Sequence, residues 1–155
     1  MMRILMEVCE TPYMMWLDDD SHVSSGWDDP IQKFILEKDP FDVAGHVFYI
    51  NERGPEYFQF LRLRPWYKSQ DREAEQVWFA TGGLFLARLD FLRKYDFPDR
   101  VMAKGMDDIL LGELCLQQDG RLVDFGGNRE IMDRIRISDG DRRGSINFSK
   151  FENFQ

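Results

Sequence analysis

The sequence has little cysteine, no long apolar run and fewer basic than acidic residues. Its 155 residues include two cysteines, Cys9 and Cys115, and neither has a second cysteine or a histidine at the spacing of a zinc ligand set. A structural zinc site is therefore not expected. Both cysteines lie in apolar helical patterns, which favours buried, reduced thiols over a disulfide.

The absence of long apolar runs argues against a membrane protein, because a membrane-spanning helix needs roughly 20 consecutive apolar residues. The segment Met1–Cys9 contains Arg3 and Glu7 and lacks the apolar centre of a signal peptide. The formal net charge of −8 disfavours a nucleic-acid partner, because phosphate backbones attract basic surfaces. We therefore expect a cytoplasmic, soluble protein with no membrane span and no nucleic-acid partner.

Apolar residues are plentiful enough for a folded core. Hydrophobic residues make up 43% of the chain and aromatic residues 14%, which fits one folded domain and argues against disorder. Apolar periodicity and turn residues predict helices over 1–9, 27–38, 89–95 and 106–118, and strands over 13–17, 43–50, 76–80, 84–88 and 121–125. This order predicts an α/β fold, a mixed sheet with flanking helices over residues 1–127. Residues 128–155 are expected to form a charged, partly mobile C-terminal tail.

An acidic triplet, Asp18-Asp19-Asp20, directly follows the apolar segment Tyr13–Leu17. Such a segment is typical of a strand covered on both faces at the centre of an α/β sheet, and ligands of these sheets bind beyond the carboxyl ends of the strands. Adjacent carboxylates repel one another unless a cation lies between them. Because Mg²⁺ and Mn²⁺ prefer oxygen ligands, the triplet indicates a divalent-cation site. The alternative is a solvated loop that helps to cap the next helix.

Two histidines follow the triplet. His22 comes two residues after Asp20 and is a further candidate metal ligand, although a histidine in a loop more often faces solvent. His46 lies within a predicted strand and is interpreted as structural.

A second acidic pair, Asp107-Asp108, begins a helix that is apolar on nearly every side. Such a helix is buried, so its first turn is held in place by packing. A carboxylate on a rigid element is suited to act as a general base. The alternative needs no function, because acidic residues in a first turn are favoured by the helix dipole by about 0.3–1 kcal/mol.

The segment Thr81-Gly82-Gly83 separates two predicted strands. Paired glycines allow the backbone to approach a ligand closely, and they equally allow a plain turn or bulge.

Taken in order, these segments resemble the family 2 glycosyltransferases of GT-A fold. The resemblance covers roughly residues 1–125, and its specificity lies in the order and spacing of three motifs: LDDDSHV, FATGGLFLARLDFLRKY and GMDDILLGELCLQQDGRLVDF. It implies a partial GT-A domain that transfers a sugar from a nucleoside-diphosphate sugar to an acceptor hydroxyl, with inversion and with Mn²⁺ or Mg²⁺.

The resemblance also implies a role for each motif. The first motif would bind the cation and, through it, the donor diphosphate; its residues are Asp18 and Asp20, with Asp19 beside them and His22 as an added candidate. The small residues Thr81, Gly82 and Gly83 would lie on the sugar and acceptor side. Asp108 would be the catalytic base, with Asp107 standing where the family more often has Glu.

The first half of such a domain, a strand–helix–strand region that binds the nucleobase, has no counterpart before the first predicted helix. We therefore expect an open sheet edge that favours self-association. Two other functions stay open: a non-catalytic or truncated transferase-like binding or assembly module, and a phosphohydrolase built on a carboxylate–metal site.

Overall fold

The fold is known from a computed structural model, which describes residues 2–19, 21–51, 66–67, 76–95, 107–125 and 128–136. The described residues form helices together with a mixed, open sheet, so the predicted α/β class is confirmed. The elements are α1 (Met2–Val8), β1 (Tyr13–Leu17), β2 (His22–Val23), α2 (Asp28–Lys38), β3 (Val43–Asn51), β4 (Gln76–Arg88), α4 (Leu89–Leu92), α6 (Asp107–Gln117), β5 (Leu122–Asp124), α7 (Arg129–Arg134) and β6 (Ile135–Arg136).

The main sheet is mixed and open. Its order is β1-β4-β3-β5, with β4 antiparallel to both of its neighbours and β3 parallel to β5. Consequently β1, β3 and β5 all run in the same direction, and β1 and β5 finish at the same end of the sheet. A second sheet pairs β2 with β6 in antiparallel fashion.

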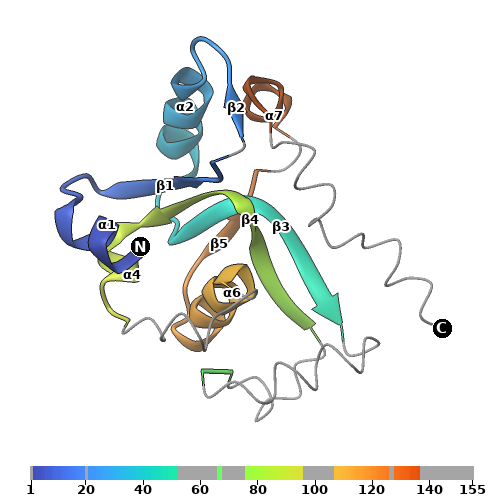
Figure 1. The fold of residues 1–155 in the computed structure, drawn as a ribbon. Helices are drawn as coiled ribbons and strands as arrows, with labels where there is room; N and C mark the ends of the chain where they lie inside the picture. Colours follow the sequence, from blue (N-terminus) through green and yellow to red (C-terminus); the bar gives the residue numbers. More distant parts are fainter. Residues whose placement is uncertain are drawn as a thin grey trace.

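Helices cover both faces of the main sheet, with α6 on one side and α2 and α7 on the other (Figure 1). Alternate residues of each strand enter different cores because side chains of a strand point to opposite faces in turn. Met14, Phe85 and Ala87 pack with α1, α4 and α6. Leu84, Leu86 and Ala44 pack with α2 and α7.

The strand β1 has the predicted bounds and is covered on both faces, but it is not central. Within the described residues it pairs with β4 on one side only. Trp16 and Met14 face the α6 side, whereas Met15 and Leu17 face the α2 side. The apolar run therefore predicts correctly that both faces of the strand are covered, but it does not predict which strands lie beside it.

The predicted break at Thr81-Gly82-Gly83 is a bulge within one long strand, β4, and does not separate two strands. Gly45 of β3 pairs with Phe85 of β4, and Val47, two residues later, pairs with Ala80. Residues 81–84 of β4 therefore have no partner in β3. Extra residues on one strand bend that strand and expose its backbone.

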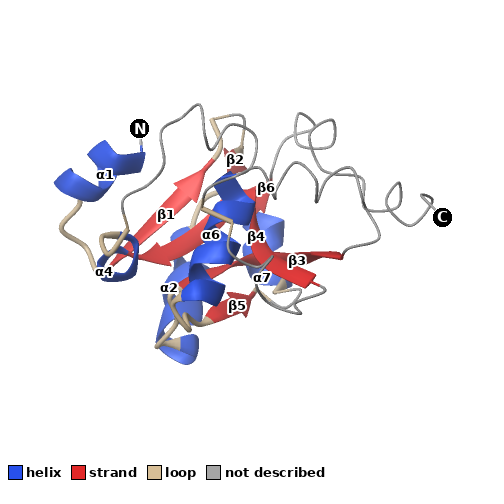
Figure 2. Ribbon diagram, turned by 90° about the horizontal axis from the view of Figure 1, so that it is seen from below, coloured by secondary structure: helices blue, strands red, loops and turns tan. Residues whose placement is uncertain are grey.

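The helix α6 lies across the middle of the sheet, as Figure 2 shows from the side of α6. Five of its apolar side chains are buried (Ile109, Leu110, Leu111, Leu114 and Cys115), whereas Leu116 is 40% exposed. Gly112 lets the helix approach β4, since a Cβ there would lie 2.7 Å from the Cβ of Phe79. The predicted packing of this helix is thus confirmed.

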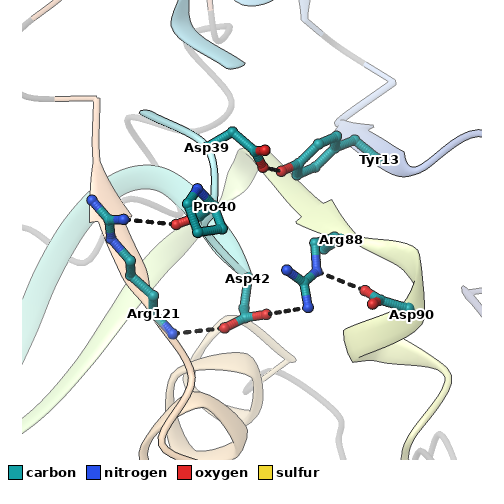
Figure 3. A network of polar contacts seen from close by, with 7 residues as sticks. All are labelled: Tyr13, Asp39, Pro40, Asp42, Arg88, Asp90 and Arg121. Carbon is teal, nitrogen blue, oxygen red and sulfur yellow. Dashed lines mark hydrogen bonds and ion pairs between the residues drawn. The ribbon is translucent and has the colours of Figure 1, made fainter. Parts of the chain in front are cut away.

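At the end of the sheet where β1, β3 and β5 begin, a polar network connects the residues that flank these strands (Figure 3). Asp42 receives hydrogen bonds or ion pairs from two arginines, the Arg88 guanidinium at 3.3 Å and the Arg121 backbone N–H at 2.8 Å. The Tyr13 hydroxyl donates to the Asp39 carboxylate. Burial and this hydrogen bond raise the pKa of Tyr13 to about 12.

Residues 128–136 belong to the folded body, although the sequence placed them in the tail. Asn128 caps α7, accepting a hydrogen bond from the Ile131 N–H at 3.4 Å. Ile131 and Ile135 are both fully buried in the core on the α2 side. Two apolar residues four positions apart are too few to predict a buried helix in a segment rich in charged residues. Residues 137–155 of the predicted tail lie outside the described part of the chain.

The described helices include none that is long and apolar enough to cross a bilayer. Both cysteines are free, Cys115 buried and Cys9 half-buried. Burial raises the pKa of the Cys115 thiol to about 12. His46 lies in β3 as predicted, between Gly45 and Val47, where the pairing with β4 shifts register.

Candidate functional site

The acidic turn that follows β1 is held by backbone and side-chain hydrogen bonds. The Asp18 N–H donates to the Gly83 carbonyl at 3.2 Å, and the Ser21 N–H donates to the Asp18 carbonyl at 3.0 Å. The Trp16 indole N–H donates to the Asp18 carboxylate at 3.2 Å. Trp16 is itself fixed by stacking on Phe85, with ring centroids 6.1 Å apart. The Asp18 carboxylate is therefore oriented by a packed side chain.

The alternation of β1 also determines which face the Asp18 side chain occupies. Met14 and Trp16 pack into the core beneath α6, and Asp18 follows two residues later with its carboxylate bonded to Trp16. Asp18 thus lies on the α6 side of the sheet.

The β4 bulge borders this turn directly. The bulge residues 81–84 leave β3, and the Gly83 carbonyl turns to the backbone of Asp18. The structure therefore brings together two segments that the sequence analysis singled out separately, the acidic turn and the Thr81-Gly82-Gly83 segment.

Ser21 is a polar residue of this turn that sequence reasoning missed. Its hydroxyl oxygen is buried and has no hydrogen-bond partner among the described residues. A buried polar group without a partner costs about 1–3 kcal/mol, so it is rarely retained without a reason. Nothing distinguishes one serine in a loop from another in the sequence, and only the fold shows that this hydroxyl is enclosed next to Asp18.

The other acidic-turn candidates are placed less closely. Asp19 is exposed, and Asp20 lies outside the described residues. His22 is exposed on β2 and stands opposite Arg136 of β6. No group of three or more His, Cys, Asp or Glu side chains in the described part of the chain is arranged to hold a metal ion.

The oxygen donors that are described still fit a hard cation shared with a ligand. Magnesium commonly takes only one or two protein carboxylates, with water and phosphate oxygens completing its coordination. Asp18 supplies an oriented carboxylate, and Ser21 supplies a hydroxyl oxygen that no described residue binds. In a cation site of this kind Asp18 and Asp20 would be the protein ligands.

The acidic pair at the start of α6 is partly described. Asp108 is half-buried, and its carboxylate accepts a hydrogen bond from the Ile109 N–H at 2.8 Å. That contact fits an acidic residue that stabilises the start of the helix through the helix dipole, and it equally fits a catalytic role. Asp107 is the first residue of α6.

The direction of α6 places this pair relative to the sheet. The Tyr95 hydroxyl, just beyond α4, reaches the Leu114 carbonyl at 3.5 Å, so the C-terminal half of α6 lies beside the end of β4. Its N-terminal end therefore points away from the start of β1, and Asp108 lies on the same face of the sheet as Asp18.

Comparisons with protein-family models, with curated proteins and with solved structures found no match to this chain.

Proposed function

We propose that the acidic turn after β1, together with the β4 bulge beside it, binds a nucleoside-diphosphate sugar with a divalent cation and transfers the sugar to an acceptor hydroxyl. The observation that carries the proposal is the contact between the Asp18 N–H and the Gly83 carbonyl. It joins two segments that are far apart in the sequence and that have separate roles in the resemblance to GT-A glycosyltransferases.

The donor diphosphate is assigned to the acidic turn. Asp18 and Asp20 would hold the cation, with Asp19 next to them in the sequence and His22 as an additional candidate ligand. A bound Mn²⁺ or Mg²⁺ neutralises the negative charge of a departing diphosphate. The buried Ser21 hydroxyl, which lacks a partner in the described residues, is suited to donate a hydrogen bond to a phosphate oxygen.

The acceptor side is assigned to Thr81, Gly82 and Gly83 and to the start of α6. Asp108 takes the proton of the acceptor hydroxyl while that oxygen attacks the anomeric carbon; the bond to the nucleoside diphosphate breaks, and the configuration inverts. The support for Asp108 is its place on a helix fixed by the buried residues Ile109 and Leu110. A base on a rigid element keeps its geometry through the reaction.

The test is turnover of UDP- and GDP-sugars with Mn²⁺ and a panel of hydroxyl acceptors, read by mass spectrometry of the product. Asp108→Asn is expected to lower kcat by about 10²–10⁴-fold, the usual contribution of a general base. The control is Asp119→Asn, the same chemical change at an exposed residue beyond the other end of α6. It should leave kcat within a few-fold of the wild-type value.

Other outcomes would replace the proposal. If Asp108→Asn is as active as Asp119→Asn, Asp108 is not the base. Release of phosphate from simple esters, without sugar transfer, would identify a carboxylate–metal phosphohydrolase. A folded chain that neither turns over nor binds any nucleoside diphosphate would be a non-catalytic binding or assembly module.

A further inference from the structure

The loop that carries the acidic turn is also bound at its far end by the C-terminal part of the fold. The loop over residues 21–26 contains the short strand β2, which pairs with β6 through His22 opposite Arg136 and Val23 opposite Ile135. Residues from two ends of the described chain therefore meet beside the candidate site.

Arg134, at the junction of α7 and β6, makes most of these contacts. Its guanidinium donates to the Ser25 carbonyl at 2.6 Å. Its own carbonyl accepts hydrogen bonds from the Ser24 N–H at 2.9 Å and from the Ser24 hydroxyl at 3.2 Å. One residue thus binds two consecutive residues of the loop, from both its side chain and its backbone.

Gly26 leaves room for the Arg134 side chain. A Cβ at this position would lie 3.1 Å from a guanidinium nitrogen of Arg134. Gly26 also has a φ of +67°, a conformation that side-chain-bearing residues rarely adopt. The turn after Ser25 is therefore shaped so that the guanidinium can lie against it.

The elements on either side of Arg134 are firmly anchored. Ile131 and Ile135 are fully buried beneath the sheet, so the helix and strand that carry Arg134 cannot shift without opening the core. At the near end of the loop, Asp18 is tied to the β4 bulge through Gly83. The described residues on either side of Asp20 are therefore attached to the folded body, at Asp18 through Gly83 and at Ser24 and Ser25 through Arg134.

We propose that Arg134 is a positioning residue, which fixes the acidic loop in the arrangement that binds the donor diphosphate. The consequence for binding rests on the function proposed above, whereas the restraint on the loop does not. The restraint can therefore be measured on the protein alone.

The experiment compares Arg134→Met, Arg134→Lys and the control Arg129→Met by amide hydrogen exchange and by calorimetric titration of UDP with Mn²⁺. Methionine keeps an apolar stem without donors, and lysine keeps one donor that can reach the Ser25 carbonyl. Arg129 is exposed on the same helix. For Arg134→Met we expect about tenfold faster exchange of amides 18–25, an about tenfold weaker Kd and unchanged exchange in β3 and β4.

The lysine variant should recover part of the protection and part of the affinity, and Arg129→Met should match the wild type. The inference is overturned if Arg134→Met leaves loop exchange unchanged, or if exchange rises equally in β3 and β4, which would indicate a general loss of stability. It is also overturned if the wild type binds UDP with Mn²⁺ and Arg134→Met binds it equally well. If the wild type binds no nucleotide, the proposed function fails, and loop exchange alone decides the role of Arg134.

Discussion

At the scale of single residues, some polar groups of the acidic turn form hydrogen bonds that stabilise the folded protein, whereas one buried hydroxyl does not. Trp16 and Gly83 satisfy Asp18, and both contacts stabilise the free protein. The Ser21 hydroxyl is enclosed without a hydrogen-bond partner in the described residues. A group that weakens the free protein is the one whose removal best separates stability from binding.

Replacing Ser21 by alanine is therefore expected to act in opposite directions on stability and on affinity. The ligand-free protein should gain about 1 kcal/mol, because the unpaired buried hydroxyl is removed. For a chain of this length that is roughly 2–4 °C in Tm. Binding of UDP with Mn²⁺ should weaken by about tenfold, the value of a typical hydrogen bond to a charged group. Differential scanning calorimetry and titration calorimetry measure the two effects.

The control for this change is Ser25→Ala, which alters an exposed side chain two residues before Trp27. It should change neither Tm nor affinity appreciably. A Ser21→Ala protein that is less stable than the wild type would show that the hydroxyl has a structural partner, and the assignment to the ligand would then be wrong.

Tyr13 gives a second prediction at this scale, at the other end of the sheet. Burial and the hydrogen bond to Asp39 raise its pKa from 10.0 to about 12. Because the folded-state pKa is above the unfolded value, this contribution to stability is complete below pH 10 and is lost as the pH rises through about 12. Burial raises the pKa of Tyr95 to about 12 as well.

Ultraviolet titration of phenolate absorbance should thus show late ionisation of Tyr13 and of Tyr95. Tyr13→Phe should remove one late step, and Tyr95→Phe the other. If Tyr13→Phe instead removes a step near pH 10, the hydroxyl of Tyr13 is solvated in solution and its bond to Asp39 does not persist.

At the scale of elements, the position of α6 depends on one close approach to β4. A Cβ on Gly112 would lie 2.7 Å from the Cβ of Phe79 and 2.9 Å from its Cα, and backbone cannot yield as a flexible side chain can. Gly112→Ala should therefore destabilise the protein by about 2–3 kcal/mol, as overpacking does, despite the better helix propensity of alanine.

Urea unfolding followed by circular dichroism measures this loss. Gln118→Ala, at an exposed residue just after α6, is the control and should change the free energy of unfolding little. A Gly112→Ala protein as stable as the wild type would mean that α6 does not lie against Phe79, and the direction assigned to Asp108 would lose its support.

Elements were predictable from the sequence where periodicity decides them. The bounds of β1 and the approximate bounds of α2, β3, α6 and β5 follow from apolar spacing and from Pro and Gly at their ends. The short pair β2–β6 was not predictable, because its two-residue strands exist only through pairing between distant segments. The order of the strands was not predictable for the same reason.

The residues of the candidate site likewise fall into those that the sequence predicts and those that only the fold identifies. Asp18, Gly83 and Asp108 were chosen from local patterns, and the fold adds the contact between the first two. Ser21 and Arg134 carry no local pattern, since a loop serine and a helix arginine are common. Their significance depends on burial and on a contact with a remote backbone carbonyl.

At the scale of the whole molecule, the polar groups differ between the two ends of β1. The network of Asp42, Arg88 and Arg121 lies where β1, β3 and β5 begin, whereas the acidic turn and the β4 bulge lie where β1 finishes. Ligands of open α/β sheets bind beyond the carboxyl ends of the strands, and the acidic turn has this position relative to β1. Self-association through the side of β1 that has no partner strand among the described residues stays a prediction, which sedimentation velocity over a range of concentrations tests.

The central claim is that the turn after β1 binds a divalent cation together with a nucleoside diphosphate. Its most direct test is calorimetric titration of UDP and of GDP into the wild type, Asp18→Asn and Asp119→Asn, each with and without Mn²⁺. We predict that at least one nucleotide binds to the wild type and to Asp119→Asn only with Mn²⁺, and that a folded Asp18→Asn protein loses this binding. Absence of binding to the wild type, or binding that neither Mn²⁺ nor Asp18→Asn alters, would contradict the claim.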